Sequence, residues 1–481
     1  MNSARSQFPG RSLVLAAAVL WAGVLIPALG NPAAAQSVWE LTPYRIQVLL
    51  ATGPAAELTP ELEADLRADL VTQVDTLIGA GWDVTVPAPA DVPPALRRAL
   101  ISSVEALTVE SLPEASLEFD KVIPLVVLPG VNGYRVTARE LDVRTRTWSS
   151  PVTVTARQAA KLRDAAFHAV LEAFAPLAQI IAVEDRQVTL RLRAAGLPAR
   201  DKSVRAVTPG DVFQPVIRYN DRGGEFDRIT PVPWTYLTVE KAVRAELQCK
   251  LHTGLRSPLS SRRRGRVEPL ALAVIAPGKP TRLTFKSRTN PEQVLPGYDV
   301  YSHPPDSKTT TLVGRTDRRG GVLVEPAEHA LRVLLVKNGG ELLARLPLVP
   351  GMPGEIDAAI ADDDQRLTAE GFITGFEEEL VDLVTRREVL LAQVRTRVAA
   401  KQFDEADSLV RQLRRLRTRD ELARHLGQEK IRLVSDDLVV QQKIDKLFAD
   451  TQKLLQQHLD PDVVDQLARE LLEARTTKGR S

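Results

Sequence analysis

The distribution of proline divides this chain into two parts, of which only the second can form long uninterrupted helices. After the segment "PGMPGEID" (350–357), no proline occurs between Gly354 and Pro461, and the sequence becomes charged and leucine-rich. Proline inside a helix removes a backbone hydrogen bond and clashes with the preceding turn. A proline-free stretch with apolar residues at helical spacing therefore favours long helices. The sequence predicts that residues 356–475 form an antiparallel α-helical hairpin or bundle.

Apolar stripes mark the expected helices of this region. Apolar residues at helical spacing between Phe376 and Val398 line one face of the first helix. Apolar residues between Ala406 and Leu416 line one face of the second. Asp460 and Pro461 have the character of an N-cap and a first helical position, which predicts a short fourth helix. The stripe of the third helix consists of Ile431, Val434, Leu438, Leu447 and Leu454.

The region 41–178 mixes strand and helix signals and is expected to be an α/β domain. The segment "YRIQVLLA" (44–51) is typical of a strand, and Thr59 before Pro60 is a helix-start signal. The helix that follows carries leucines at helical spacing, so it presents one apolar stripe to a sheet.

Two β units are expected between this domain and the helical end. Region 179–276 contains short strand-like segments at regular spacing, which predicts a small β-barrel-like domain. Region 279–352 contains roughly six short strands separated by Pro, Gly and Asn, which predicts a compact β-sandwich. The expected fold class is thus multidomain α+β.

The first region resembles a known envelope family. Its strand "YRIQVLLA", a helix, and "GYRVTARELDVRTRTWSSPVTV" leading into "AAKLRDAAFHAVLEAF" are similar to the N-terminal domain of TolB and its relatives, among them CsgG-like proteins and the flagellar assembly protein T. The similar strand carries L-D-V-x-T, and "VTPGDVF" (207–213) further on resembles the small barrel of the flagellar protein. The resemblance implies an envelope binding module. The motif consists of Leu141, Asp142, Val143 and Thr145.

A second resemblance concerns the expected β-sandwich. The pattern G-x-T-D-x-x-G from Gly314 to Gly320 is similar to carboxypeptidase regulatory-like, or transthyretin-like, domains. Asp317 and Gly320 occupy the first and fourth positions that a type I turn prefers. We therefore expect a turn between two antiparallel strands here, with no metal or catalytic role for Asp317.

The N-terminus predicts export. Arg5 and Arg11 precede the apolar run Leu13 to Ile26, and small residues lead to Ala35. This is the pattern of a secretory signal, with cleavage expected before Gln36. About 14 apolar residues are short for a membrane span, which needs roughly 20, so an uncleaved anchor is the lesser alternative. The mature chain is expected in the periplasm or outside the cell.

Length and net charge limit the number of domains and the class of partner. A chain of 481 residues is expected to hold three or four domains. Its formal net charge of +2 gives no overall attraction to nucleic acid, so nucleic acid is not an expected partner. Binding to an anionic polymer or lipid surface would need a local patch.

No catalytic motif is present: the chain has no G-x-S-x-G, H-E-x-x-H, Walker A, dinucleotide-binding or EF-hand pattern. We expect no catalytic residue, cofactor or metal site. Cys249 lies in an alternating segment and is expected in a core. It lies three positions before His252, and residues at that spacing on a strand face opposite sides. The run Asp362 to Asp364 lacks the spacing of a calcium loop and suits a helix N-terminus.

Two arginine clusters are the candidates for contact with a partner. The first lies in a loop after "SPLSS", and the second has helical spacing of i, i+4 and i+8. Solvated surface is the alternative for both, because acidic residues lie near the second cluster. The candidates are Arg262, Arg263, Arg264 and Arg266 in the first cluster and Arg411, Arg415 and Arg419 in the second.

These observations favour a non-catalytic exported adaptor or scaffold of the cell envelope that acts by binding other proteins. The alternative is a secreted hydrolase or polysaccharide-binding protein whose site combines residues distant in sequence. A cavity with two or more titratable groups of shifted pKa would favour the alternative.

Overall fold

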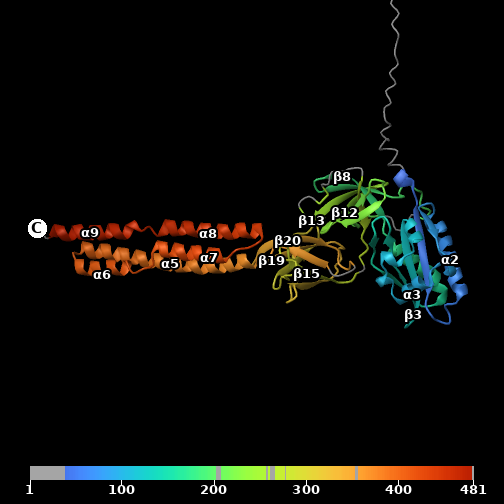
Figure 1. The fold of residues 1–481 in the computed structure, drawn as a ribbon, viewed down its shortest axis with the longest axis horizontal. Helices are drawn as coiled ribbons and strands as arrows, with labels where there is room; N and C mark the ends of the chain where they lie inside the picture. Colours follow the sequence, from blue (N-terminus) through green and yellow to red (C-terminus); the bar gives the residue numbers. More distant parts are fainter. Residues whose placement is uncertain are drawn as a thin grey trace, which may run out of the picture.

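The computed structural model shows a head of three β-containing units and a long helical arm (Figure 1). The predicted signal segment lies outside the residues that the structure describes. Within the described ranges, no helix has the length and apolar character needed to cross a membrane. The expected multidomain α+β fold class is confirmed. The described residues are 38–201, 207–255, 258–259, 266–276, 278–352 and 356–478.

The first unit is a sheet covered by helices on both faces. Its central strands are parallel, and the last two are antiparallel additions at one edge. The strand order is β2 (Trp82–Thr85), β1 (Tyr44–Thr52), β3 (Lys121–Gly130), β4 (Gly133–Ala138) and β7 (Val152–Ala156).

Helices α2 (Pro60–Gln73) and α4 (Leu162–Ala173) pack on one face of this sheet, and α3 (Pro94–Ser102) packs on the other. The predicted cap is confirmed, because the Thr59 hydroxyl accepts a hydrogen bond from the backbone N–H of Leu62 at 3.3 Å. Leucines of α2 lie buried against apolar side chains of β1 and β3. The sheet is thus the middle layer of three.

The second unit is a ring of antiparallel strands. One edge of β10 pairs with β14, and its other edge pairs first with β12 and then with β11. Cys249 lies in its core, fully buried, as expected from the sequence. The strands are β8 (Leu177–Glu184), β9 (Gln187–Leu192), β10 (Val212–Asn220), β11 (Phe226–Pro231), β12 (Thr235–Val243), β13 (Glu246–Thr253) and β14 (Val267–Ala273).

The third unit is a sandwich of two sheets around one apolar core. One sheet has the order β18 (Gly321–Val324), β15 (Thr281–Ser287) and β21 (Ile356–Ile360). Strand β21, which lies beyond the 279–352 range, pairs in parallel with β15. The other sheet has the order β17 (Thr311–Arg315), β16 (Asp299–His303), β19 (Arg332–Asn338) and β20 (Glu341–Leu348).

The turn at Asp317 is present, but it does not join a hairpin. The Gly320 N–H donates to the Asp317 carbonyl at 2.9 Å, and Gly320 has φ 71°. Strands β17 and β18 on its two sides belong to different sheets of the sandwich. Two strands flank the turn as expected, but they do not pair with each other as antiparallel neighbours. The turn carries the chain from one layer of the sandwich to the other.

The arm consists of three antiparallel passes of helix (Figure 1). Helix α5 (Asp364–Ala399) has 36 residues, so it is roughly 54 Å long at 1.5 Å per residue. Its first half packs on α7 (Arg419–Arg432) and α8 (Leu438–His458). Its second half packs on α6 (Phe403–Leu413) and α9 (Asp462–Lys478). The predicted antiparallel helical bundle is confirmed.

One predicted stripe in the arm is wrong. Ile431, Val434 and Leu438 were expected to line the inside of a single helix, but α7 ends at Arg432 and α8 begins at Leu438. All three side chains are exposed, at 79%, 57% and 79%. The chain turns between the two helices, and the turn directs these residues outward.

Candidate functional site

A buried lysine lies where the first two head units meet. Lys121 is the first residue of β3, a strand whose next six residues are all buried. In the sheet it pairs with Ile46 of β1 on one side and with Asp142 of β5 (Leu141–Asp142) on the other. Its side chain is 0% exposed. A buried ammonium group requires partners for its charge and for its three N–H donors.

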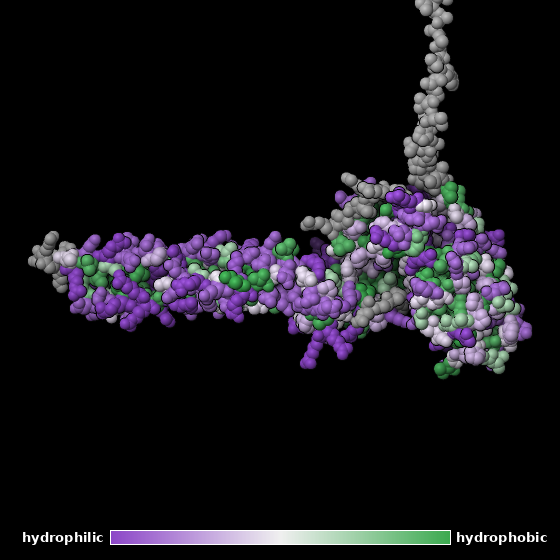
Figure 2. Space-filling view, viewed as in Figure 1, coloured by the Kyte–Doolittle hydropathy of each residue, from purple (hydrophilic) through white to green (hydrophobic). Residues whose placement is uncertain are grey.

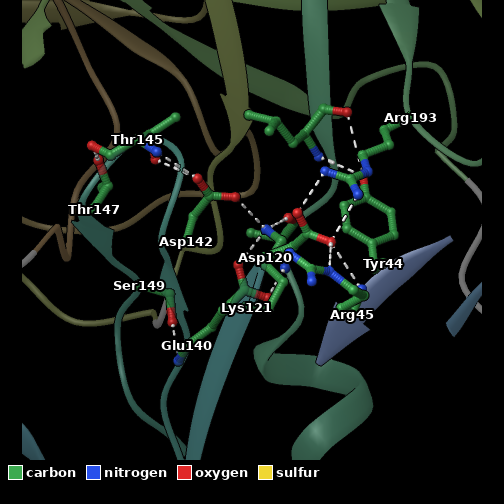
Figure 3. Close-up of polar contacts among 12 residues, drawn as sticks. Tyr44, Arg45, Asp120, Lys121, Glu140, Asp142, Thr145, Thr147, Ser149 and Arg193 are labelled. Atoms are coloured by element: carbon green, nitrogen blue, oxygen red, sulfur yellow. Dashed lines mark hydrogen bonds and ion pairs between the residues drawn. The ribbon is translucent and has the colours of Figure 1, made fainter. Parts of the chain in front are cut away.

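Lys121 has three such partners (Figure 3). Its Nζ lies 2.6 Å from Glu140 Oε1 and 2.8 Å from Asp142 Oδ2. It also donates to the carbonyl of Ala175 at 2.5 Å. The ammonium group thus makes two hydrogen bonds, to Glu140 and Ala175, and an ion pair with Asp142. We call these four residues the Lys121 cluster.

Local turns orient both carboxylates of the cluster. Asp142 Oδ1 accepts from the Thr145 backbone N–H at 2.7 Å and from the Thr145 hydroxyl at 2.8 Å. This leaves Oδ2 for Lys121. Glu140 Oε2 accepts from the backbone N–H of Ala175 at 2.8 Å. Within the L-D-V-x-T motif, Thr145 thus orients the carboxylate of Asp142 toward the buried ammonium group of Lys121.

Burial and charge together set the protonation of the cluster. Burial raises the pKa of Glu140 to about 7; Lys121 opposes this shift, and the neighbouring Asp142 charge adds to it. Burial acts to lower the pKa of Lys121, but Asp142 and Glu140 outweigh it and hold that pKa above its ordinary value. One ammonium group balances one carboxylate, so the second carboxylate retains its proton more tightly than a free glutamate.

The cluster holds the connection between the α/β unit and the ring. Ala175 lies between the end of α4 and the start of β8, and both its N–H and its carbonyl bind the Lys121 cluster. Two residues later, the N–H of Leu177 donates to the hydroxyl of Tyr44 at 3.0 Å. Burial raises the pKa of Tyr44 to about 12, so this hydroxyl keeps its proton.

Two arginine pairs reinforce the junction from both sides. Arg193, which follows β9 of the ring, binds both oxygens of Asp120 at 2.8 and 2.7 Å (Figure 3). Arg144 of the α/β unit lies 2.6 Å from Glu268 of β14. The two units are thus joined by charge pairs as well as by a fixed linker.

The Lys121 cluster is suited to a structural role. Lys121, Glu140 and Asp142 have side chains that are 0 to 1% exposed, so a substrate has no access to them. General acid or base catalysis requires contact with the reacting group. The arrangement instead holds a peptide segment in a fixed position between two units.

An apolar cavity adjoins this junction. It has a volume of about 300 Å³ and is formed by residues of both units. Tyr44, Trp82 and Phe174 form its aromatic wall, with ring centroids 5.0 Å apart for Tyr44 and Phe174 and 4.5 Å apart for Trp82 and Phe174. Arg193 and Arg244 are the charged residues described in its lining.

A second cavity, of about 520 Å³, lies between the ring and the sandwich and is more polar. Asp185, Arg186, His252 and Arg345 line it. Burial lowers the pKa of His252 to about 4, although Asp306 acts in the opposite direction. Among these four residues, His252 is the one with a resolved pKa shift.

Four of the seven arginine candidates lie in the described residues, and these four do not come together in one site. Arg262, Arg263 and Arg264 lie outside the described residues, and Arg266 is exposed just before β14. In the arm, α6 ends at Leu413 and α7 begins at Arg419, so the three predicted positions do not share one helix face. The expected stripe of Arg411, Arg415 and Arg419 on one helix is wrong. Arg411 pairs with Asp407 at 2.5 Å, and Arg419 lies 3.6 Å from Asp420.

The remaining candidates also have structural roles. Burial raises the pKa of the Cys249 thiol to about 12, which opposes thiolate formation. Asp363 forms a buried pair with Arg366, while Asp362 accepts from Gln293 at 2.7 Å. In the described ranges, no group of three His, Cys, Asp or Glu side chains is placed to hold a metal ion.

The sequence reasoning did not identify Lys121 or Glu140. A signal was present, because "KVIPLVVL" (121–128) places a lysine at the start of an otherwise apolar strand. The segment "RELD" (139–142) places two carboxylates on either side of a leucine, and alternate residues of a strand share a face. A lysine beside such a strand is a candidate for a buried ion pair.

Comparison with known proteins adds little. No family model and no curated protein matches the chain. Among solved structures, TolB from Acinetobacter baumannii is similar, with 11% sequence identity, coverage of 64% of this chain and 83% of that chain, and a TM-score of 0.17. This similarity supports a distant resemblance to TolB and nothing closer.

Proposed function

We propose that this protein is a non-catalytic exported scaffold of the cell envelope that presents its helical arm to a partner protein. The single observation that carries the proposal is the arm itself. Helices α5 to α9 project from the head (Figure 1) and have apolar cores of their own. Such an arm extends the reach of the chain without contributing to either head cavity.

The base of the arm supports this role because it is fixed to the head. Arg366 on α5 lies 2.5 Å from Asp363, and their side chains are 3% and 0% exposed. Arg366 also donates to the carbonyl of Asn338 in the sandwich at 3.1 Å. The Asp363 N–H donates to the hydroxyl of Tyr298, another sandwich residue, at 3.0 Å. The direction of the arm is therefore set by the sandwich.

Further contacts hold the α7–α8 turn near the same place. Arg288 of the sandwich pairs with Asp437, the N-cap of α8, at 2.5 Å. Lys443 on α8 pairs with Glu341 of β20. Two of the three helical passes are thus tied to the sandwich, and the α7–α8 turn is held at the base of the arm.

The exposed turn between α7 and α8 is the surface we assign to partner contact. Most of the visible arm surface is polar, with apolar areas along it (Figure 2). The turn carries four exposed aliphatic residues within nine positions: Ile431, Val434, Leu438 and Val439. Isolated apolar residues on a surface are common, whereas a contiguous group is typical of an interaction site.

The two head cavities give less support to a hydrolase. The polar cavity contains one group with a resolved pKa shift, His252, and its shift favours the neutral ring. Paired groups of shifted pKa are typical of catalytic sites. The Lys121 cluster contains shifted groups, but they are closed to solvent.

Site-specific photocrosslinking in cells tests the proposal. A photoreactive residue replaces Leu438 at the α7–α8 turn, Leu472 on α9, or Leu323 on the head as the control; these positions are 79%, 68% and 48% exposed. We expect Leu438 to give a discrete crosslink to another envelope protein and Leu323 to give none. Absence of a crosslink from both arm positions, with the full-length chain present and folded, would refute the arm as the contact surface.

A further inference from the structure

The apolar cavity at the head junction has the features of a small-molecule site. Ligand sites tend to occur at domain interfaces, as apolar cavities of about 300–1,000 Å³ with a few polar groups. This cavity lies between the α/β unit and the ring and has a volume of about 300 Å³. Trp82 and Phe174, both nearly buried, form part of its wall.

The charges at the cavity have one sign. Arg193 and Arg244 line it, and no acidic side chain does so among the described residues. Arg193 is already bound to both oxygens of Asp120 and to the carbonyl of Pro43. Its charge is therefore compensated within the protein and is not the group that a ligand would meet.

Arg244 differs from Arg193 in having no partner among the residues that the structure describes. It lies in the turn between β12 and β13, its side chain is exposed, and it forms no ion pair or side-chain hydrogen bond with any residue in the described ranges. An unpaired guanidinium at the edge of an apolar cavity offers planar donors that match a carboxylate. A cationic ligand would be repelled there.

The turn between β12 and β13 positions Arg244. Strand β12 pairs with β13 as far as Val243 and Glu246, so Arg244 is the first residue of a two-residue hairpin turn. Its φ of 55° is the geometry that such turns require. The hairpin thus places Arg244 beside the cavity.

Volume limits the size of the ligand. A cavity of about 150 Å³ accommodates benzene, so twice that volume accommodates about a dozen non-hydrogen atoms. An apolar body of that size with one negative end is a medium-chain aliphatic carboxylate. A nucleotide or an oligosaccharide has more polar groups than the apolar walls can satisfy.

We propose that the cavity binds a medium-chain fatty acid. Its hydrocarbon chain packs against Trp82 and Phe174, and its carboxylate binds the guanidinium of Arg244. This inference goes beyond the scaffold role and does not depend on it, because binding is measured on the purified chain without any partner protein.

Calorimetric titration of the full-length chain with decanoate tests the proposal. We expect saturable binding of one decanoate per chain. The Arg244→Gln variant should bind decanoate about tenfold or more weakly, because a charged hydrogen-bonding partner is lost. The matched control Arg222→Gln changes an exposed arginine in the β10–β11 turn, outside the cavity lining, and should bind as the unaltered chain does.

Two further measurements complete the test. Ala242→Phe places a larger side chain at an exposed position in the cavity lining and should abolish binding while the unfolding midpoint stays unchanged. Decylamine has a chain of the same length with the opposite charge and should not bind. Absence of saturable binding, equal binding of decanoate and decylamine, or unchanged affinity in Arg244→Gln or Ala242→Phe would each overturn the proposal.

Discussion

The two junctions of this molecule both use a buried ion pair, but they join different things. At the head, Lys121 binds Glu140, 19 positions away, and the carbonyl of Ala175, 54 positions away. At the arm, Arg366 binds Asp363, which is three positions away, at the start of the same helix. The first junction is assembled from distant segments, whereas the core of the second is local.

The two junctions should differ in how far the loss of the ion pair affects the rest of the structure. The Lys121 cluster holds a linker whose two sides belong to separate units, so its loss should loosen one unit against the other. The Arg366 pair orients the first turn of α5, and its other carboxylate, Glu370, is 40% exposed. Water can compensate part of the loss there. The head junction should therefore be the more sensitive of the two.

The largest expected effect comes from Lys121→Met. The change leaves two buried carboxylates without their cation, which should destabilise the α/β unit by about 3–5 kcal/mol. Because the chain has several units, residue-resolved hydrogen exchange is the appropriate measurement. Lys161→Met is the matched control, since Lys161 is 70% exposed and lies 3.5 Å from Asp164; its effect should stay below about 1 kcal/mol. Equal effects of the two changes would contradict a clamp at Lys121.

The next effect is expected from Arg366→Met. This change leaves Asp363 buried without its partner, and we expect a loss of about 2–3 kcal/mol, confined to the base of the arm. Burial already raises the pKa of Asp363, against the effect of Arg366, so the carboxyl group can take up a proton and limit the loss. Hydrogen exchange should increase at the start of α5 and remain unchanged in the α/β unit. Increased exchange in the α/β unit would contradict the local character of this junction.

The smallest expected effect is a pH dependence at Glu140. Its pKa is raised to about 7 in the folded protein from an ordinary value of 4.5, so the folded state binds a proton more tightly than the unfolded state. The free energy of unfolding should therefore fall as pH rises from about 4.5 to 7. Lys121, Asp142 and Tyr44 are the charged or titratable groups that contribute to this shift or face the same cluster.

Glu140→Gln tests this sign. The amide mimics the protonated carboxyl group, so the variant should lose the fall in stability and should be at least as stable as the unaltered chain at about pH 8. Denaturation of the α/β unit at about pH 5 and pH 8, followed by hydrogen exchange, gives the comparison. A variant that is less stable at both pH values by the same amount would show that the charge of Glu140 stabilises the fold.

Local signals in the sequence predicted local features well. The Thr59 cap and the turn at Asp317 follow from a few neighbouring residues, and both are present. The pairing across the Asp317 turn was wrong because strand partners are chosen by the two sheets of the sandwich. No feature of the turn residues encodes that choice.

The sequence contained a signal against a single helix carrying the arginine stripe of the arm. Thr418 and Glu421 form a capping box, with hydrogen bonds of 3.2 and 2.9 Å, and this box starts α7. The pattern T-x-x-E is a recognisable helix start, and it separates Arg415 from Arg419. The cavity beside Arg244 had no comparable signal, because its walls come from two units, and no local pattern in the sequence shows how these units pack together.

The length of α5 makes the arm a lever. A tilt of one degree at its base displaces the far end of a rod of roughly 54 Å by about 1 Å. The contacts of Asp363 with Arg366 and Tyr298 lie at the pivot. Small rearrangements in the sandwich are therefore amplified along α5, so that a tilt of a few degrees displaces the far end of α5 by several ångströms.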